Sequence, residues 1–199
     1  MKGLNQVVVA FFGEGAFEEG VVHESLNFAA LKNIPLIFVC ENNGYSVYSN
    51  VEERQPKRPI TSIPKSHGWE VHSGDGNDVQ AVVNITREAV SRIHQGRGPQ
   101  FLEFETYRWL EHCGPNEDDH LGYRPEQELQ MWKEKCPIKR TRKHLLDEGL
   151  VSESELVSIQ KTIESEIHKA FQFARSSPAP NPDTLFNFSN TEDIKCIPS

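Results

Sequence analysis

The chain lacks the cysteine patterns that mark two special classes of protein. It has four cysteines in 199 residues, with no CxxC pair and no spacing typical of a metal site. A disulfide framework is therefore not expected, and the pattern favours a reducing, cytoplasmic compartment. His112, Cys113 and His120 lie close in sequence, but no fourth ligand follows at a suitable spacing, so we expect no metal cluster there.

An excess of basic charge and long apolar runs are also lacking. The chain has 21 Lys and Arg against 29 Asp and Glu, a formal net charge of −8. This balance disfavours a nucleic acid or an acidic membrane as the main partner. No apolar run approaches the roughly 18 residues that a membrane-spanning helix needs, and we expect no signal peptide. With 37% hydrophobic and 25% charged residues, the composition is that of a globular domain.

The first part of the chain predicts a parallel sheet. Residues 7–12 and 36–40 are continuous apolar runs, typical of strands buried on both faces. Between them, apolar residues recur at helical spacing until Asn33-Ile34-Pro35. Strand, helix and strand over about 35 residues form a βαβ unit, so the two strands should be parallel. Further strands are predicted at 69–72 and 100–107, and a helix at 79–93 capped by Asn77 or Asp78.

The second part of the chain predicts a loop and then helices. Residues 110–124 are polar and read as a long exposed loop, whose acidic run 117–119 is interpreted as a solvated tip. A helix is expected over 125–135. Ser152 and Glu155 form a capping box that opens a long helix, whose apolar stripe we expect to pack. The predicted fold class is α/β, a parallel sheet with flanking helices plus a C-terminal helical segment. The predicted domains are an α/β part at 1–124, a helical part at 125–176 and a tail at 177–199.

Polar residues follow the first two predicted strands. Gly13-Glu14-Gly15 ends the first run and Asn43 follows the second. Because the carboxyl ends of parallel strands meet at one edge of a sheet, Glu14 and Asn43 are expected to be neighbours. The glycines allow a tight turn, and the helix expected behind them would favour an anion such as a phosphate.

A carboxylate at a phosphate site requires a cation. Mg²⁺ takes oxygen ligands, commonly one or two carboxylates plus substrate phosphates. Asn43 would add an amide oxygen, and the backbone at Tyr45 a carbonyl. The pattern predicts a site for a metal-bridged diphosphate, although each motif alone is more often a simple turn.

The same residues carry a resemblance to a known family. "GEGAFEEG…ENNGY" looks like the thiamine-diphosphate motif, usually GDG followed by NN. "GDGNDVQAVVNITREAV", "GRGPQFLEFETYRW" and "ARSSPAPNP" resemble the alpha subunit of the 2-oxo acid dehydrogenase decarboxylating component. Pyruvate, branched-chain 2-oxo acid and acetoin dehydrogenases share this subunit, and the resemblance runs from Val7 to about Pro182. The literal GDG at 74–76 has no Asn-Asn after it and is interpreted as a turn and helix cap.

The resemblance implies cofactors and roles. Thiamine diphosphate and Mg²⁺ are the expected cofactors, with Glu14, Asn43 and the carbonyl of Tyr45 as metal ligands. The backbone of Gly13, Gly15 and Ala16 belongs to the diphosphate-binding turn. Arg108 matches an arginine that touches the diphosphate. His112 matches a loop histidine thought to act in acid/base work or in acyl transfer to lipoamide.

The resemblance also implies partners. In the family a beta subunit supplies the glutamate that activates the cofactor, and a lipoyl-carrying acyltransferase receives the acyl group. Family members carry over a hundred residues before this motif, so we expect a fragment, a split subunit or a degraded copy. A separate chain would then cover the exposed edge of the sheet.

The sequence departs from the family pattern at three places, and two other functions are considered beside a catalytic subunit. Glu14 replaces the usual Asp, Leu110-Glu111 replaces the usual loop residues, and Cys113 stands where mitochondrial relatives have a regulatory serine. A non-catalytic binding or scaffold chain is the main alternative to a catalytic subunit. A general nucleotide-binding domain is disfavoured, because neither GxGxxG nor GxxxxGK occurs. The substrate stays open among pyruvate, branched-chain acids, acetoin and other oxo acids.

Overall fold

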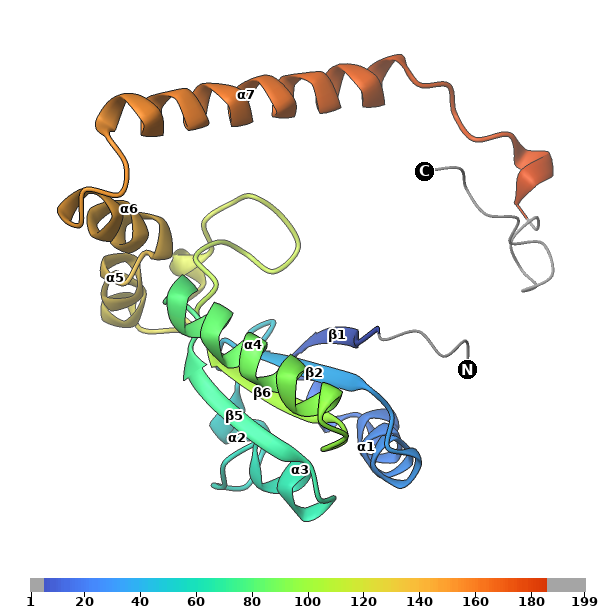
Figure 1. Cartoon of the computed structure of the whole chain (residues 1–199). Helices are drawn as coiled ribbons and strands as arrows, with labels where there is room; N and C mark the ends of the chain where they lie inside the picture. Colours follow the sequence, from blue (N-terminus) through green and yellow to red (C-terminus); the bar gives the residue numbers. More distant parts are fainter. Residues whose placement is uncertain (1–5, 186–199) are drawn as a thin grey trace. The chain divides into compact units, whose positions relative to one another are not determined.

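The computed structural model describes residues 6–185 (Figure 1), which divide after Leu145 into two compact units. The strands of the first unit are β1 (Val8–Gly13), β2 (Leu36–Asn42), β3 (Tyr45–Ser46), β4 (Ser49–Asn50), β5 (Glu70–Asp75) and β6 (Gln100–Glu105). Its helices are η1 (Ala16–Glu18), α1 (Gly20–Lys32), α2 (Val51–Arg54), α3 (Ser62–Ser66), α4 (Val79–His94), η2 (Asp119–Leu121) and α5 (Glu126–Glu134). Helix α6 (Pro137–Asp147) crosses the boundary, and α7 (Glu153–Ser176) and η3 (Pro182–Thr184) belong to the second unit.

The main sheet is parallel, with strand order β1-β2-β6-β5. This confirms the predicted α/β class and the strand–helix–strand unit at its start. Gly13 pairs with Glu41, and Asn42 pairs with Glu105, so the carboxyl ends of β1, β2 and β6 are level. Whatever follows these strands therefore emerges at one edge of the sheet.

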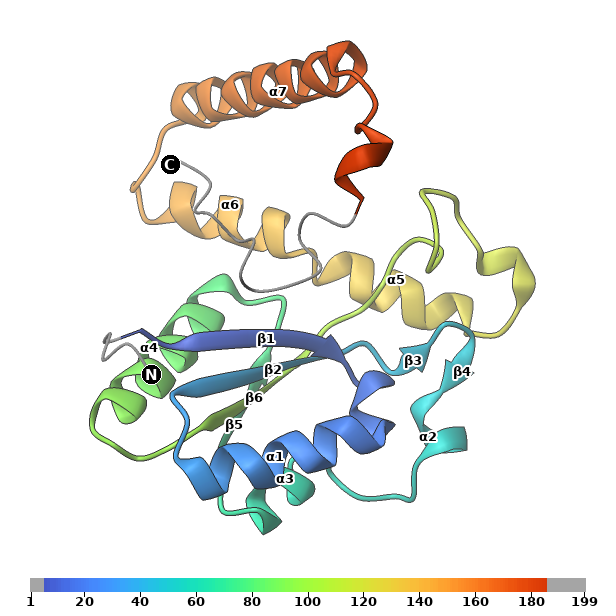
Figure 2. The same cartoon turned by 90° about the vertical axis from the view of Figure 1, so that its right-hand side faces the viewer.

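Both faces of the sheet are covered over β2 and β6, which explains the continuous apolar run of β2 (Figure 2). The prediction that residues 7–12 are also buried on both faces is wrong within the described chain, because Val8, Val9 and Phe11 are 58%, 42% and 68% exposed. Along β2, Phe38 and Cys40 pack on the side of α1, together with Leu26. Ile37 and Val39 pack on the other side, in a cluster built with α4. Alternate residues of one strand thus supply two cores. A third cluster, of Tyr45, Tyr107 and Leu129, joins α5 to the ends of the strands.

Strand β1 lies at the edge of the sheet (Figure 2). The side chains of Val8 and Phe11 are 58% and 68% exposed. An apolar edge strand is a template for pairing with another chain. The expectation that a separate chain covers this edge stays a prediction, and β1 has the features that it requires.

The predicted helix boundaries are confirmed by their caps. Asn33 ends α1 in the left-handed conformation, with φ of 48°. The carboxylate of Asp78 accepts hydrogen bonds from Gln80 N and Ala81 N and so caps α4, as expected for one of the two candidates. The literal GDG at 74–76, interpreted above as a turn and helix cap, is therefore the end of β5 and the turn before this cap.

Residues 45–66 contain elements that the sequence did not predict. The hairpin β3–β4 and the short helices α2 and α3 are all found there. This segment is polar and holds three prolines, so it has no run with helical or strand period. The sequence therefore gives no account of the region directly after Asn43.

In the second unit, the predicted capping box is present, because Glu155 N donates to Ser152 Oγ and Ser152 N donates to Glu155 Oε2. Within this unit no described side chain of α7 is buried. Ile159, Ile163 and Ile167 are each about half exposed, so the packing expected of this stripe is not made within the unit. Among the described residues, no helix has both the length and the apolarity needed to cross a membrane.

The predicted domain boundary after residue 124 stays a prediction. The first compact unit continues to residue 145 and so includes α5. The reason is a polar and aromatic contact, in which Tyr45 Oη donates to Glu128 Oε2 at 2.7 Å and Tyr107 stacks on Trp132.

Candidate functional site

The structure brings the two predicted motifs together. Glu14 follows β1 and Asn43 follows the neighbouring strand β2. The backbone N–H of Asn43 donates a hydrogen bond of 3.4 Å to Oε2 of Glu14. The expectation that these residues are neighbours, although 29 positions apart, is confirmed.

The Asn-Asn-Gly segment forms a tight turn. Asn43 Oδ1 accepts a hydrogen bond of 2.9 Å from Tyr45 N, and Asn42 Oδ1 accepts one of 3.1 Å from Gly44 N. Asn43 Oδ1 has a second lone pair, which this turn leaves free for another contact. Tyr45 is buried, and burial together with the hydrogen bond to Glu128 raises its pKa to about 12. The Asn-Asn-Gly segment is therefore a turn, as the simpler interpretation of this motif predicted. The turn leaves one lone pair of Asn43 Oδ1 for a ligand.

Gly15 is needed for the close approach of the two loops. A Cβ at this position would lie 2.7 Å from Ser46 Oγ and 2.8 Å from Ser46 Cβ. Only glycine lets the turn after β1 pack against the hairpin that follows Asn43. The role predicted for this glycine at a diphosphate stays a prediction, and the structure gives it a packing role against Ser46.

One expectation about this turn is wrong. The sequence placed the N-terminus of a long helix directly behind Gly15. The structure instead has the single turn η1 at Ala16–Glu18, and α1 begins only at Gly20. The free N–H groups of a long helix therefore do not lie immediately after the motif, and Ala16 belongs to the short turn.

Glu14 is buried and carries an ion pair that the sequence did not reveal. Its exposed fraction is 1%. Burial raises the pKa of this carboxyl, and the backbone N–H groups and Arg54 oppose the shift in part. Arg54 Nη2 donates to Glu14 Oε1 at 2.8 Å and comes from α2 in the unpredicted segment. With no element predicted there, sequence reasoning had no means of placing this arginine.

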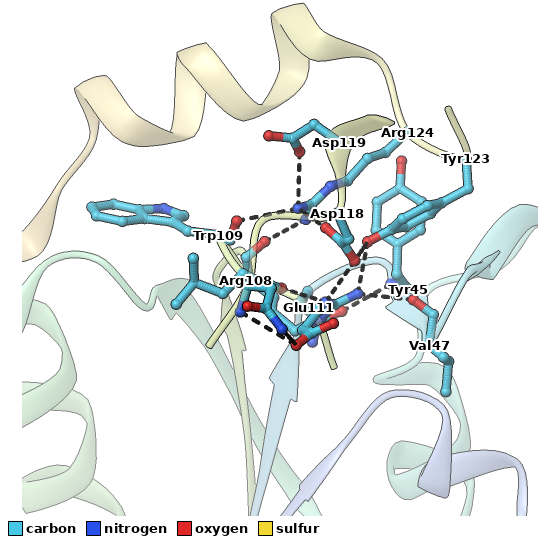
Figure 3. Close-up of polar contacts among 12 residues, drawn as sticks. Tyr45, Val47, Arg108, Trp109, Glu111, Asp118, Asp119, Tyr123 and Arg124 are labelled. Atoms are coloured by element: carbon cyan, nitrogen blue, oxygen red, sulfur yellow. Dashed lines mark hydrogen bonds and ion pairs between the residues drawn. The ribbon is translucent and has the colours of Figure 1, made fainter. Parts of the chain in front are cut away.

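Arg108 lies in a second polar cluster, centred on a buried carboxylate (Figure 3). Asp118 accepts hydrogen bonds from Arg124 Nη2 at 2.6 Å and from Tyr123 Oη at 2.7 Å. Arg108 Nη1 lies 3.4 Å from the same carboxylate, and its Nη2 donates to Val47 O at 2.9 Å. Arg108 thereby ties the loop after β6 to the hairpin after Asn43.

This cluster corrects the interpretation of the acidic run at 117–119. Asp118 is 2% exposed and is not part of a solvated tip. Burial alone would raise the pKa of Asp118, but Tyr123, Arg124 and Arg108 outweigh it and the pKa is lowered. The sequence contained the partner, since Arg124 follows six residues later, but a polar loop has no period that shows which charges meet.

His112 is exposed in the loop between β6 and η2. Among the described residues, no hydrogen bond joins it to Glu14 or Asn43. Within residues 6–185 no group of three or more His, Cys, Asp and Glu side chains is arranged to hold a metal. The predicted ligand set is of another kind, because it combines one carboxylate with an amide oxygen and a backbone carbonyl.

A family model described as "Dehydrogenase E1 component" matches residues 1–183. The chain belongs to the dehydrogenase E1 component family. This confirms the resemblance drawn from the motifs at the strand ends.

Relatives of this E1 chain include alpha subunits of two dehydrogenases. It is 38% identical over 184 residues to the mitochondrial 2-oxoisovalerate dehydrogenase subunit alpha of Macaca fascicularis, covering 92% of this chain and 41% of the relative. It is 37% identical over 186 residues to the pyruvate dehydrogenase E1 component subunit alpha of Porphyra purpurea, covering 90% and 52%. The corresponding protein of Rhizobium meliloti (strain 1021) is 35% identical, with 93% and 53% covered. The chain thus spans about half the length of the curated relatives that it matches.

The residues at the strand ends suit the cofactor that this family resemblance implies. Glu14, Asn43 and the backbone near Tyr45 offer oxygen atoms alone, the ligands that Mg²⁺ prefers. Asn43 Oδ1 keeps one lone pair beyond its hydrogen bond from Tyr45 N. The chemistry of these donors fits a metal-bridged diphosphate.

Proposed function

We propose that this chain is the diphosphate-holding part of the alpha subunit of a thiamine-diphosphate- and Mg²⁺-dependent 2-oxo acid or acetoin dehydrogenase. One observation carries the proposal. In a chain of the E1 family, a buried carboxylate and an asparagine meet at the level ends of two adjacent parallel strands, at Glu14 and Asn43. Ligands of open parallel sheets bind at this edge.

Each residue then has a proposed role. Glu14, Asn43 and the carbonyl of Tyr45 bind the cation, and the backbone at 13–16 lies along the diphosphate. Arg108 holds the loop after β6 against the hairpin and contributes positive charge beside the diphosphate. His112, on an exposed loop, holds or moves a proton at the reacting edge of the cofactor. When bound, thiamine diphosphate supplies the carbanion chemistry of decarboxylation.

The proposal includes partner chains and a location. A beta subunit would supply the glutamate that activates the cofactor, and a lipoyl-carrying acyltransferase would accept the acyl group. A further chain segment would pair with the apolar edge at β1, where Val8 and Phe11 are exposed. The described cysteines, Cys40, Cys113 and Cys136, are free thiols, which supports a reducing, cytoplasmic compartment.

A non-catalytic binding chain is the second candidate. The observation that favours it is the ion pair between Glu14 and Arg54, which neutralises the proposed metal ligand inside the chain. Such a chain would keep the fold of the E1 family without binding the cofactor.

Calorimetric titration of thiamine diphosphate with Mg²⁺ separates the two candidates. The full chain is titrated alone and with the beta subunit, beside the variants Asn43→Ala and Asn84→Ala. Asn84 is exposed on α4, so it controls for the loss of an asparagine away from the site. We expect micromolar binding that Asn43→Ala abolishes and Asn84→Ala leaves intact. Absence of heat from the unaltered chain in both settings would exclude the catalytic proposal.

A further inference from the structure

Arg54 is held at three of its nitrogen atoms. Nη2 donates to Glu14 Oε1 at 2.8 Å, Nη1 donates to Glu18 Oε1, and Nε donates to Ser49 O at 3.2 Å. The arginine side chain is 15% exposed, and that of Glu18 is 31% exposed. The guanidinium therefore lies between a buried carboxylate and one that faces solvent.

Glu14, the buried carboxylate that Arg54 contacts, is also the proposed metal ligand. A carboxylate that is 1% exposed needs a compensating positive charge, and Arg54 supplies one. A divalent cation bound by Glu14 would share this carboxylate with the guanidinium of Arg54. Two cations at one buried carboxylate repel each other strongly, because solvent screens little there. One of them has to move.

Glu18, the carboxylate that faces solvent, offers Arg54 a second position. Glu18 remains as a partner when the contact with Glu14 is broken, and Gln55 Nε2 holds Glu18 in place at 2.9 Å. The guanidinium also lies beside the motif turn, since a Cβ on Gly15 would be 3.6 Å from its Nη1. Movement away from Glu14 therefore does not leave the arginine without a partner.

We propose that Arg54 is an internal cation that neutralises Glu14 in the metal-free chain, and that a divalent metal ion displaces it onto Glu18. This inference rests on the proposed function, because it takes Glu14 as a metal ligand. It adds a residue that sets how tightly the site binds its metal. Arg54 competes for the site and is not itself a metal ligand.

Mn²⁺ binding to the full chain tests the proposal directly, with free Mn²⁺ measured by electron paramagnetic resonance. Arg54→Gln removes the competing charge, and Arg58→Gln removes the same charge from an exposed position four residues later. Glu18→Gln removes the second partner while Glu14 and Arg54 both remain. Asn43→Ala reports whether the binding takes place at the proposed site.

The variants should change the affinity in opposite directions. We expect Arg54→Gln to bind Mn²⁺ about 10- to 100-fold more tightly, since the metal no longer has to break a charge-assisted hydrogen bond. Glu18→Gln should bind a few-fold more weakly, because the displaced arginine loses its partner, and Arg58→Gln should be unchanged. Glu18→Gln keeps the buried pair, so its result stands even if Arg54→Gln fails to fold.

The two possible failures are distinguishable. If Asn43→Ala abolishes binding but Arg54→Gln binds no tighter than the unaltered chain, Arg54 is not a competitor and only this inference is overturned. Unchanged affinity in Glu18→Gln would overturn it in the same way. If neither the unaltered chain nor Arg54→Gln binds Mn²⁺, with or without thiamine diphosphate, the proposed function is overturned as well.

Discussion

Arg124 is expected to stabilise the fold far more than a surface arginine with equally short ion pairs. Its side chain is 2% exposed and lies 2.6 Å from the carboxylate of Asp118, itself 3% exposed. Breaking a buried pair leaves an uncompensated charge and costs about 3–5 kcal/mol. Asp118 would keep Tyr123 and Arg108 as partners, so we expect Arg124→Met to lower the free energy of unfolding by about 3 kcal/mol, the lower end of that range.

Arg140 provides the matched control. It forms ion pairs of 2.7 Å with both Asp75 and Asp78, and its side chain is 47% exposed. Exposed pairs contribute about 0–1 kcal/mol each, so the loss of both in Arg140→Met should cost about 2 kcal/mol or less. Urea denaturation of both variants, followed by circular dichroism, measures the two changes. If Arg140→Met costs as much as Arg124→Met, burial does not decide the strength of these pairs and the reasoning is wrong.

Three further predictions follow from named contacts. The pKa of Asp118 in the folded chain lies below the unfolded value of 3.8. The stabilisation that the ionised Asp118 gives the fold is therefore full above that pH and is lost as the pH falls through the folded pKa. In urea titrations, the stability difference between the unaltered chain and Asp118→Asn should be smaller at pH 3 than at pH 7. Val47 has φ of 55°, which is strained for a β-branched residue, so Val47→Gly should raise the melting temperature, with a gain of about 0.5–1 kcal/mol. Gly15→Ala should cost about 1–3 kcal/mol in the same assay, because the new Cβ meets Ser46, and adding Ser46→Gly should recover most of the loss.

The parallel sheet could be predicted because its strands leave a simple pattern. A strand covered on both faces is a short continuous apolar run, and β2 is such a run from Leu36 to Cys40. Parallel pairing then follows from the helix between β1 and β2, and it fixes the edge at which Glu14 and Asn43 emerge. Glu14 and Asn43 are thus neighbours because of the sheet topology, and the apolar pattern of the sequence is enough to predict that topology.

The partners of the site residues could not be predicted, because they come from segments without a period. Arg54 reaches Glu14 from a four-residue helix, and Arg124 reaches Asp118 within a polar loop. Composition shows that such segments are irregular but does not show which charges face inward. Which charges face inward depends on where the neighbouring strands and turns place their polar atoms, and this is a tertiary property.

The two buried carboxylates of the first unit differ in how readily they can exchange their partners. Asp118 has both of its short contacts, to Tyr123 and Arg124, inside the protein, and the arginine is itself 2% exposed. Replacement of any partner there would leave a buried group unsatisfied, so this cluster is suited to holding a loop in one conformation. Glu14 is equally buried, and each arginine has a second, partly exposed carboxylate, Glu18 for Arg54 and Asp119 for Arg124. The difference lies in the arginine itself, which is 15% exposed at Glu14 and 2% exposed at Asp118. Arg54 is therefore the more accessible of the two arginines, which supports the proposal of an exchangeable cation at Glu14 and a structural role for Asp118.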